Sequence, residues 1–234
     1  MHTEPSAPHA VPWTERDVWL GLASLVLLLV VAAGLAFMVR WLAFDLDLGW
    51  LVGLGELLLL APVWWLALRK YRAGWGALGL RGFTGKMLGL GCGLMLLSFV
   101  FNMAYGLFLA LFGLRIQPDL IPILAQLSSP WPLLVGGALV APLVEEVFFR
   151  GFVFGGLCGR YGWRRAALIS AALFAVIHFT PTAILPIFLL GYIFAYLYRR
   201  SGSLWPGILM HMATNTLALG VAYLVASGKL GLGG

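Results

Sequence analysis

Residues 144–150 read Val-Glu-Glu-Val-Phe-Phe-Arg and place two adjacent carboxylates and an arginine at the end of an apolar run that begins near Pro132. A charged side chain at membrane depth costs about 2.5–3.5 kcal/mol on insertion scales, so such residues are rare and usually face a polar interior. Two other polar positions interrupt apolar runs, namely His178 and the segment 211–215, His-Met-Ala-Thr-Asn. We expect these polar side chains to meet in one cavity.

The composition around this stretch is that of a polytopic membrane protein. The 234 residues are 62% hydrophobic and 10% charged, with a mean hydropathy of +0.96. A soluble domain averages about 45–50% apolar and about 25% charged residues. The net charge is +6, but the basic residues lie mostly in short loops, which indicates membrane topology rather than nucleic-acid binding. Cys92 and Cys158 fit neither a metal site nor a redox pair.

The apolar runs predict an all-α bundle of about seven transmembrane helices, with an eighth short helix left open. A bilayer core needs roughly 20 residues per helix. Residues 1–17 are expected to form a flexible polar tail, and residues 18–234 a single transmembrane domain whose motif-bearing core is 131–226. A glycine-rich, basic loop is expected at 151–165. The predicted spans are 18–39, 48–68, 87–112, 131–149, 166–179, 183–198 and 204–226.

The basic residues predict the orientation. If the N-terminus lies in the cytoplasm, all but three of the 15 lysines and arginines fall on the cytoplasmic side, the exceptions being Arg40, Arg115 and Lys229. We therefore expect an integral protein of the plasma (inner) membrane. On this topology the glutamate pair lies near the cytoplasmic end of its span, His178 lies near an outer end, and the cavity opens toward the cytoplasm. The glutamate pair and His178 lie at the same depth in the membrane only if one of these spans is kinked or displaced.

The carboxylate pair has two interpretations. Glu146 and Arg150 are four residues apart, which is the spacing of an ordinary helical ion pair. That interpretation leaves Glu145 unexplained, because it points about 100° away around the helix. If Arg150 keeps Glu146 ionised, Glu145 is the carboxylate that is free to move a proton.

Each histidine taken alone is more typical of helix packing than of chemistry. His211 and Asn215, however, are also four residues apart, so both project from one helical face. Two donors on one face suit a developing oxyanion in a water-poor site. The alternative is a pair of interhelical hydrogen bonds of about 0.6 kcal/mol each.

Other peptidase signatures are absent from the sequence. It contains no His-Glu-x-x-His zinc motif and no Gly-x-Ser-x-Gly elbow, and the four aspartates lie outside the predicted spans. The ordered set Glu145-Glu146-x-x-x-Arg150, Phe174-x-x-x-His178 and His211-x-x-x-Asn215 resembles the three motifs of the CPBP family. This is the CAAX-protease and bacteriocin-processing (Abi) family, which includes the type II CAAX prenyl endopeptidases.

The resemblance implies an all-helical intramembrane endopeptidase of the glutamate type, with no cofactor expected. By this resemblance Glu145 activates water, His178 holds that water, and His211 and Asn215 stabilise the oxyanion, while Glu146 and Arg150 support the site. A zinc-dependent version, with Glu145, His178 and His211 as ligands, stays open as the alternative. The expected partners are membrane lipid and a protein or peptide substrate, whose lipid modification is left open, and not nucleic acid.

Two non-proteolytic functions also remain as alternatives. Some proteins of this family confer bacteriocin immunity or act as membrane scaffolds, and the cavity would then bind a ligand or a partner helix. A small transporter would use Glu56 and Glu145 as proton carriers, but no internal repeat supports it. We interpret Glu56 itself as a packing contact in the second span, because no motif surrounds it.

Overall fold

The structure, a computed structural model, describes residues 10–42, 55–116, 120–127 and 129–230. Within these ranges the chain forms helices with short 3-10 and π-helical segments (labelled η) and contains no strand, which confirms the all-α membrane bundle. The elements, in chain order, are α1 (Glu15–Trp41), η1 (Leu57–Leu59), α3 (Leu60–Val63), η2 (Trp64–Arg69), η3 (Trp75–Leu78), α4 (Lys86–Ala110), α5 (Ile121–Gln126), α6 (Trp131–Val135), η4 (Gly136–Val140), α7 (Ala141–Glu146), η5 (Val147–Phe154), α8 (Gly155–Val176), η6 (Pro181–Ala183), α9 (Ile184–Ser201) and α10 (Trp205–Ala226).

The centre of the bundle is a long helical hairpin. Elements α6, η4, α7 and η5 and the first part of α8 follow one another without a loop from residue 131 to Tyr161, about 46 Å at 1.5 Å per residue. The chain then reverses at Gly162, whose φ of 72° and ψ of 158° are not helical. The returning half of α8 packs back on η5, since Ser170 Oγ donates to the Phe149 carbonyl at 2.7 Å.

This hairpin corrects the predicted loop at 151–165. The glycines at 155 and 156 do not turn the chain but let another segment approach it. A Cβ on Gly156 would lie 2.6 Å from Val18 Cγ2 and 2.7 Å from Trp13 Cδ1. Only Gly162, with its positive φ, ends the helix, because that conformation is available mainly to glycine. The predicted span 131–149 is therefore the first half of a much longer helix.

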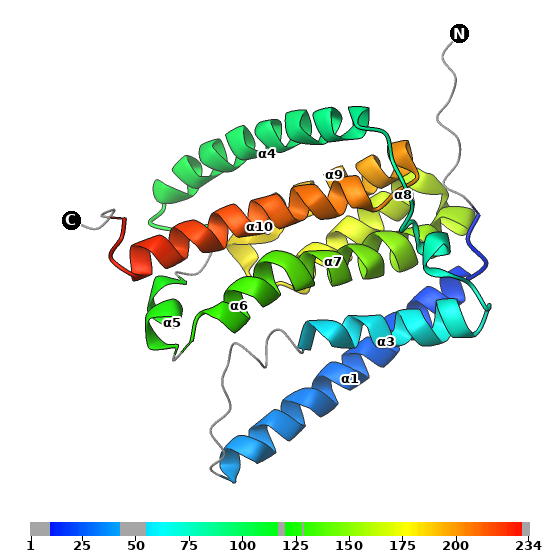
Figure 1. Ribbon diagram of the computed structural model, residues 1–234, viewed down its shortest axis with the longest axis horizontal. Helices are drawn as coiled ribbons and strands as arrows, with labels where there is room; N and C mark the ends of the chain where they lie inside the picture. The colour runs from blue at the N-terminus through cyan, green and yellow to red at the C-terminus, as the bar shows by residue number, and fades with distance from the viewer. Residues whose placement is uncertain (1–9, 43–54, 117–119, 128, 231–234) are drawn as a thin grey trace.

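The remaining helices surround the hairpin in two groups (Figure 1). Helices α9 and α10 pack directly against it, and α4 covers α9 and α10 on one side. Helices α1 and α3 lie on the opposite side, where they contact α8 and η5. α1 and α4 expose many large apolar side chains, such as Leu27, Phe37 and Leu97, as expected of surfaces that face lipid.

The chain is an integral membrane protein by the length and composition of its helices. Five described stretches are long and apolar enough to cross a bilayer: Glu15–Met38, Lys86–Ala110, Trp131–Val176, Pro181–Ser201 and Trp205–Ala226. Because Trp131–Val176 folds back at Gly162, it supplies two of the predicted spans. The predicted second span is described only from residue 55 onward, where the apolar helix Leu57–Arg69 lies. Asp45 and Asp47 lie outside the described residues.

The end of the predicted tail is packed against the bundle. Residues 1–9 lie outside the described ranges, but Trp13 is buried and its indole Nε1 donates to the Phe152 carbonyl at 2.9 Å. α1 begins at Glu15, and the buried Asp17 accepts hydrogen bonds from Lys70 and from Tyr71, the latter at 2.7 Å. The hydrogen bond to Asp17 raises the pKa of Lys70 above its usual value, so its ammonium remains charged at neutral pH.

Candidate active site

Side chains from three separate motifs line one cavity of about 300 Å³ inside the bundle. Glu145 comes from α7, His178 follows the end of α8, and His211 and Asn215 come from α10. Ala141 and Gly137 lie four and eight residues before Glu145, and these small residues leave room on the wall beside it. The four residues that we expected to converge therefore share one space.

A buried cluster of four ionisable groups forms one wall. Glu145, Glu146, Arg150 and His211 are 7%, 1%, 0% and 5% exposed. His211 Nε2 lies 3.5 Å from Glu145 Oε2, and His211 Nδ1 lies 3.3 Å from Glu146 Oε1. His211 thus bridges the two adjacent carboxylates.

Arg150 forms the predicted ion pair with Glu146. Its Nη1 lies 2.9 Å from Glu146 Oε1, but the angle is not that of a hydrogen bond, so the attraction is mainly one of charge. The guanidinium lies 4.3 Å from the centre of the Phe174 ring and 5.4 Å from that of Phe194, which are favourable cation–π positions. Glycine at 191 makes room for it, since a Cβ there would lie 3.0 Å from Arg150 Nη2.

His178 is fixed by its own helix. Its Nδ1 lies 2.7 Å from the Phe174 carbonyl oxygen. A carbonyl oxygen can only accept, so Nδ1 carries the proton and Nε2 is left as an acceptor. The ring also packs edge-on against Phe174, with centroids 4.8 Å apart. The available nitrogen of His178 is therefore a base or a hydrogen-bond acceptor for a molecule in the cavity.

Asn215 is anchored to the hairpin through one of its two amide hydrogens. Its Nδ2 donates to the Gly137 carbonyl at 2.9 Å. Gly137 lies in η4, a π-helical segment that precedes Pro142. Proline cannot donate a hydrogen bond to the preceding turn, and a π-helical segment changes which carbonyls are bonded within the helix. The second hydrogen on Nδ2 can serve a ligand in the cavity.

The hairpin removes the mismatch in depth expected from the sequence. Because the helix continues to Tyr161, Glu145 lies near its middle rather than at its end. The lining of the cavity extends away from the basic end of the bundle, which is the end toward which we expected the cavity to open. Its lining reaches Leu120, Thr180 and Ala183, which lie at the end where α9 begins, whereas Arg199 and Arg200 lie where α9 ends.

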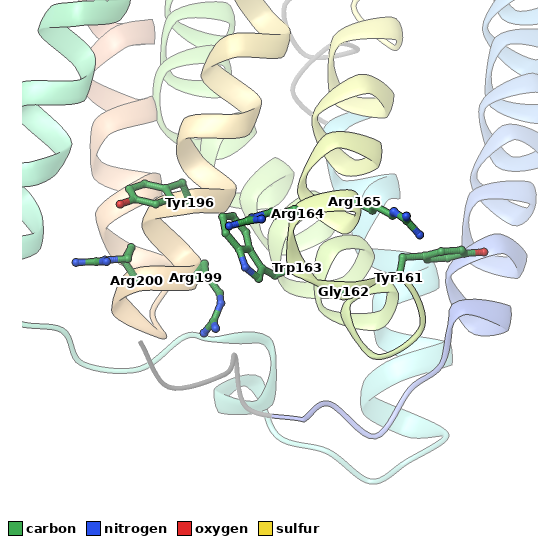
Figure 2. A pocket seen from close by; sticks show the side chains of 8 residues that line it. All are labelled: Tyr161, Gly162, Trp163, Arg164, Arg165, Tyr196, Arg199 and Arg200. Carbon is green, nitrogen blue, oxygen red and sulfur yellow. The ribbon is translucent and has the colours of Figure 1, made fainter. Parts of the chain in front are cut away.

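A larger hollow, of about 620 Å³, lies at that basic end and is shown in Figure 2. Its walls carry Arg164, Arg165, Arg199 and Arg200, together with Tyr161, Trp163 and Tyr196. It contains no carboxylate and no histidine among its lining residues. We place the candidate chemistry in the smaller cavity because that space joins a buried acid to two histidines.

Two residues near the site were given no role from the sequence, and a third, Glu56, was given one only in the transporter alternative. Phe174 was noted only as part of a motif, yet its ring contacts Arg150, His178 and His211. Gly137 was one small residue of an apolar run, and the π-helical segment that exposes its carbonyl leaves no sequence signal beyond the nearby proline. Glu56, interpreted as a packing contact, is half-buried at the start of η1, which packs on α7.

The donor geometry gives a zinc site no support. Among the described residues, no three histidine, cysteine, aspartate or glutamate side chains gather in a way that could hold a metal ion. The three ligands of the zinc alternative share the cavity, and of the two histidines only His211 has a ring nitrogen within 4.0 Å of the Glu145 carboxylate among the described contacts. The metal alternative is therefore left to experiment.

Comparison with known proteins confirms the resemblance drawn from the motifs. Residues 127–217 match the family described as type II CAAX prenyl endopeptidase Rce1-like, and this stretch contains all three motifs. The chain is 31% identical over 87 residues to the "Putative membrane peptidase YdiL" of Bacillus subtilis, an alignment that covers 37% of this chain and 36% of that protein.

Two further relatives match over a similar length. The "Uncharacterized 24.3 kDa protein" of Escherichia coli is 37% identical over 86 residues, which are 35% of this chain and 40% of that protein. The "UPF0177 protein YxdF" of Lactococcus lactis is 30% identical over 78 residues, which are 33% of this chain and 42% of that protein. The chain thus spans less than half the length of each relative, and no solved structure matches it.

Proposed function

We propose that this membrane protein, whose residues 127–217 are of the Rce1-like type, is an intramembrane endopeptidase that uses Glu145 to activate water. The observation that carries the proposal is the single cavity lined by Glu145, His178, His211 and Asn215. An acid, two imidazoles and an amide supply a base and hydrogen-bond donors in one space.

The contacts of the two carboxylates separate their roles. The guanidinium of Arg150, which is always charged, lies 2.9 Å from Glu146 Oε1. Within the described part of the chain, Glu145 makes no such contact with a cation, and its Oε2 lies 3.5 Å from His211 Nε2. Glu145 is therefore the carboxylate that can exchange a proton with a molecule in the cavity.

The reaction then follows from these positions. Glu145 takes a proton from water while Nε2 of His178 accepts the other water hydrogen and orients the molecule. The water oxygen attacks the peptide carbonyl, and the resulting oxyanion accepts hydrogen bonds from Asn215 Nδ2 and from a ring N–H of His211. Glu145 returns its proton to the leaving amine, and the carbon–nitrogen bond breaks. Glu146 and Arg150 keep His211 in place and are positioning residues.

The proposal is tested with the purified protein in liposomes and a fluorogenic peptide library. Glu145→Gln keeps the size of the side chain and removes the base. General base catalysis contributes about 10²–10⁴-fold, so we expect a loss of kcat/KM of at least about 100-fold. Glu15→Gln, the same change outside the cavity, is the control and is expected to retain wild-type activity. Wild-type activity in Glu145→Gln excludes this mechanism.

The zinc alternative is tested on the same preparation. Dialysis against a chelator, followed by elemental analysis, gives a metal-free sample. We expect that sample to cleave peptide at the rate of the untreated protein. Loss of activity on chelation, restored by added zinc, overturns the metal-free mechanism and makes Glu145, His178 and His211 its ligands.

A non-enzymatic role gives the opposite result in cells. If the protein confers bacteriocin immunity or acts as a scaffold, Glu145→Gln retains the phenotype at unchanged expression. Comparison of processed peptide termini between wild-type and Glu145→Gln cells separates the two functions. It also identifies the substrate, and shows whether the substrate is lipid-modified, in the plasma membrane where we propose that the protein resides.

A further inference from the structure

The cavity of the candidate active site extends from the middle of the helices toward one end, and the basic residues lie at the other end. Ile187 near the start of α9, and Ala183 just before it, line the cavity, while Arg199 and Arg200 lie in the last turn of α9. The hairpin shows the same polarity. Gly137 and Ala141 line the cavity, whereas Gly162 and the arginines beside it form the turn at the other end.

The two ends differ strongly in charge. Figure 2 shows four arginines around the hollow at the hairpin turn, with the aromatic side chains of Tyr161, Trp163 and Tyr196 among them. Because α1 starts and η2 ends at this same end (Figure 1), the basic residues between η2 and α4 lie there too. These further basic residues are Arg16, Arg69, Lys70, Arg72, Arg81, Lys86 and Arg160. The cavity end has only Arg115 and Lys229 among the described loops, and Arg40 in the last turn of α1.

Such an asymmetry sets orientation, because short loops rich in lysine and arginine remain in the cytoplasm. We propose that the basic end faces the cytoplasm and that the catalytic cavity opens to the opposite, extracytoplasmic side of the membrane. The cavity runs from Glu145 in mid-helix to Leu120 and Thr180 at that side. The buried Arg150 is part of the site and does not count toward either end.

The substrate class follows, and this part rests on the proposed endopeptidase function. A peptide bond reaches the cavity only from the extracytoplasmic side. The substrates are then exported peptides, or membrane proteins cut in the segment just outside the bilayer. Cytoplasmic proteins with a prenylated C-terminus do not meet this site.

Cysteine accessibility tests the orientation without any activity assay. In a background in which Cys92 and Cys158 are replaced by alanine, single cysteines are introduced by Thr180→Cys in the cavity, Ser227→Cys after α10 and Thr84→Cys before α4. Ser227 and Thr84 are both exposed and close in size to cysteine, which makes them a matched pair for the two ends. A charged maleimide that cannot cross membranes is added to intact cells and to inverted vesicles.

In intact cells we expect labelling of Thr180→Cys and Ser227→Cys but not of Thr84→Cys, with the reverse pattern in inverted vesicles. Labelling of Thr84→Cys alone in intact cells overturns the proposal, because the cavity then faces the cytoplasm. Labelling of all three in both preparations overturns it as well, because it shows that no single orientation exists. Ser227→Cys labelling without Thr180→Cys labelling in intact cells shows that the cavity does not open on that side.

A separate readout tests the substrate class. Peptides in the medium and on the outer surface of the membrane are compared between wild type and Glu145→Gln. Cleaved extracytoplasmic termini that depend on Glu145 support the proposal, whereas cleavage confined to cytoplasmic segments contradicts it. If no peptide bond is cut at all, the proposed function fails while the labelling result still decides the orientation.

Discussion

Arg150 shows how burial changes the meaning of a sequence pattern. The spacing of Glu146 and Arg150 correctly predicts their ion pair, now seen at 2.9 Å. At a helix end such a pair contributes at most about 0.5 kcal/mol. In the structure Arg150 is fully buried in the middle of the bundle, between the rings of Phe174 and Phe194. Spacing alone does not give depth, because depth depends on where the helix stops.

The first prediction concerns this pair. Removing one partner of a buried ion pair leaves the other charge uncompensated and costs about 3–5 kcal/mol. Arg150→Met is therefore expected to lower the free energy of unfolding by about this amount, measured by thermal unfolding in detergent. The double variant Arg150→Met with Glu146→Gln removes both charges and is expected to recover most of the stability but not the activity. Equal destabilisation of the single and double variants contradicts the explanation.

The second prediction separates the two histidines. His178 is fixed only by the Phe174 carbonyl and its ring, whereas His211 is bridged to both glutamates. His178→Ala is expected to lower kcat at least about 100-fold with little change in the midpoint of thermal unfolding. His211→Ala is expected to lower both kcat and the midpoint of thermal unfolding, because Glu145 and Glu146 then face each other without the imidazole between them. A stability loss confined to His178→Ala reverses these assignments.

At the scale of helices, the sequence predicts that a helix exists better than it predicts the residue at which the helix ends. The starts of the runs at 131 and at 204 agree closely with α6 and α10, because proline and tryptophan mark both. The end predicted at 149 is wrong by about a dozen residues. A glycine can allow the chain to reverse direction, or it can allow another segment to pack closely against a helix. The sequence pattern does not distinguish these two roles. Within α8, Gly156 lets Trp13 pack closely against the helix, whereas Gly162 is the glycine with positive φ at which the chain reverses.

The third prediction compares two glycines of α8. In Gly156→Ala the new Cβ would lie under 3.0 Å from both Val18 and Trp13, a clash that something must relieve. Overpacking of this kind costs about 1–3 kcal/mol. Gly159→Ala, one turn later, meets nothing within 4 Å and is expected to be neutral or stabilising by up to about 1 kcal/mol. Thermal unfolding of both variants checks the contrast, and a stable Gly156→Ala argues against this packing.

At the scale of the whole molecule, the sequence predicts a membrane bundle and the convergence of its motifs, but not how far the cavity lies from the basic end of the bundle. Apolar content decides the fold class, and the i to i+4 spacings place each pair on one face. The side of the cavity depends on how deep Glu145 lies, which in turn depends on the reversal at Gly162. A single glycine thus changes the relation between the site and the basic end of the molecule.

The fourth prediction tests that reversal. Asparagine tolerates the left-handed helical region but not the region of Gly162, with φ of 72° and ψ of 158°. Gly162→Asn is expected to cost about 1–3 kcal/mol and to reduce the yield of folded protein. Gly202→Asn, at φ of 67° and ψ of 8°, lies in the left-handed region and serves as the control that is expected to fold normally. Equal behaviour of the two variants contradicts the special role of the turn.

The hydrogen bond from Trp13 to the Phe152 carbonyl has a consequence for how the protein can be divided. Residues 127–217 carry every motif, yet the helix that holds Glu145 depends on an indole contributed more than a hundred positions earlier in the chain. A fragment that began near residue 127 would lack Trp13. The Phe152 carbonyl would then lose its hydrogen-bond donor, and the space beside Gly156 would lose the side chain that fills it. Residues 127–217 therefore do not form an independent unit. A chimera that contains them also needs the amino-terminal segment with Trp13.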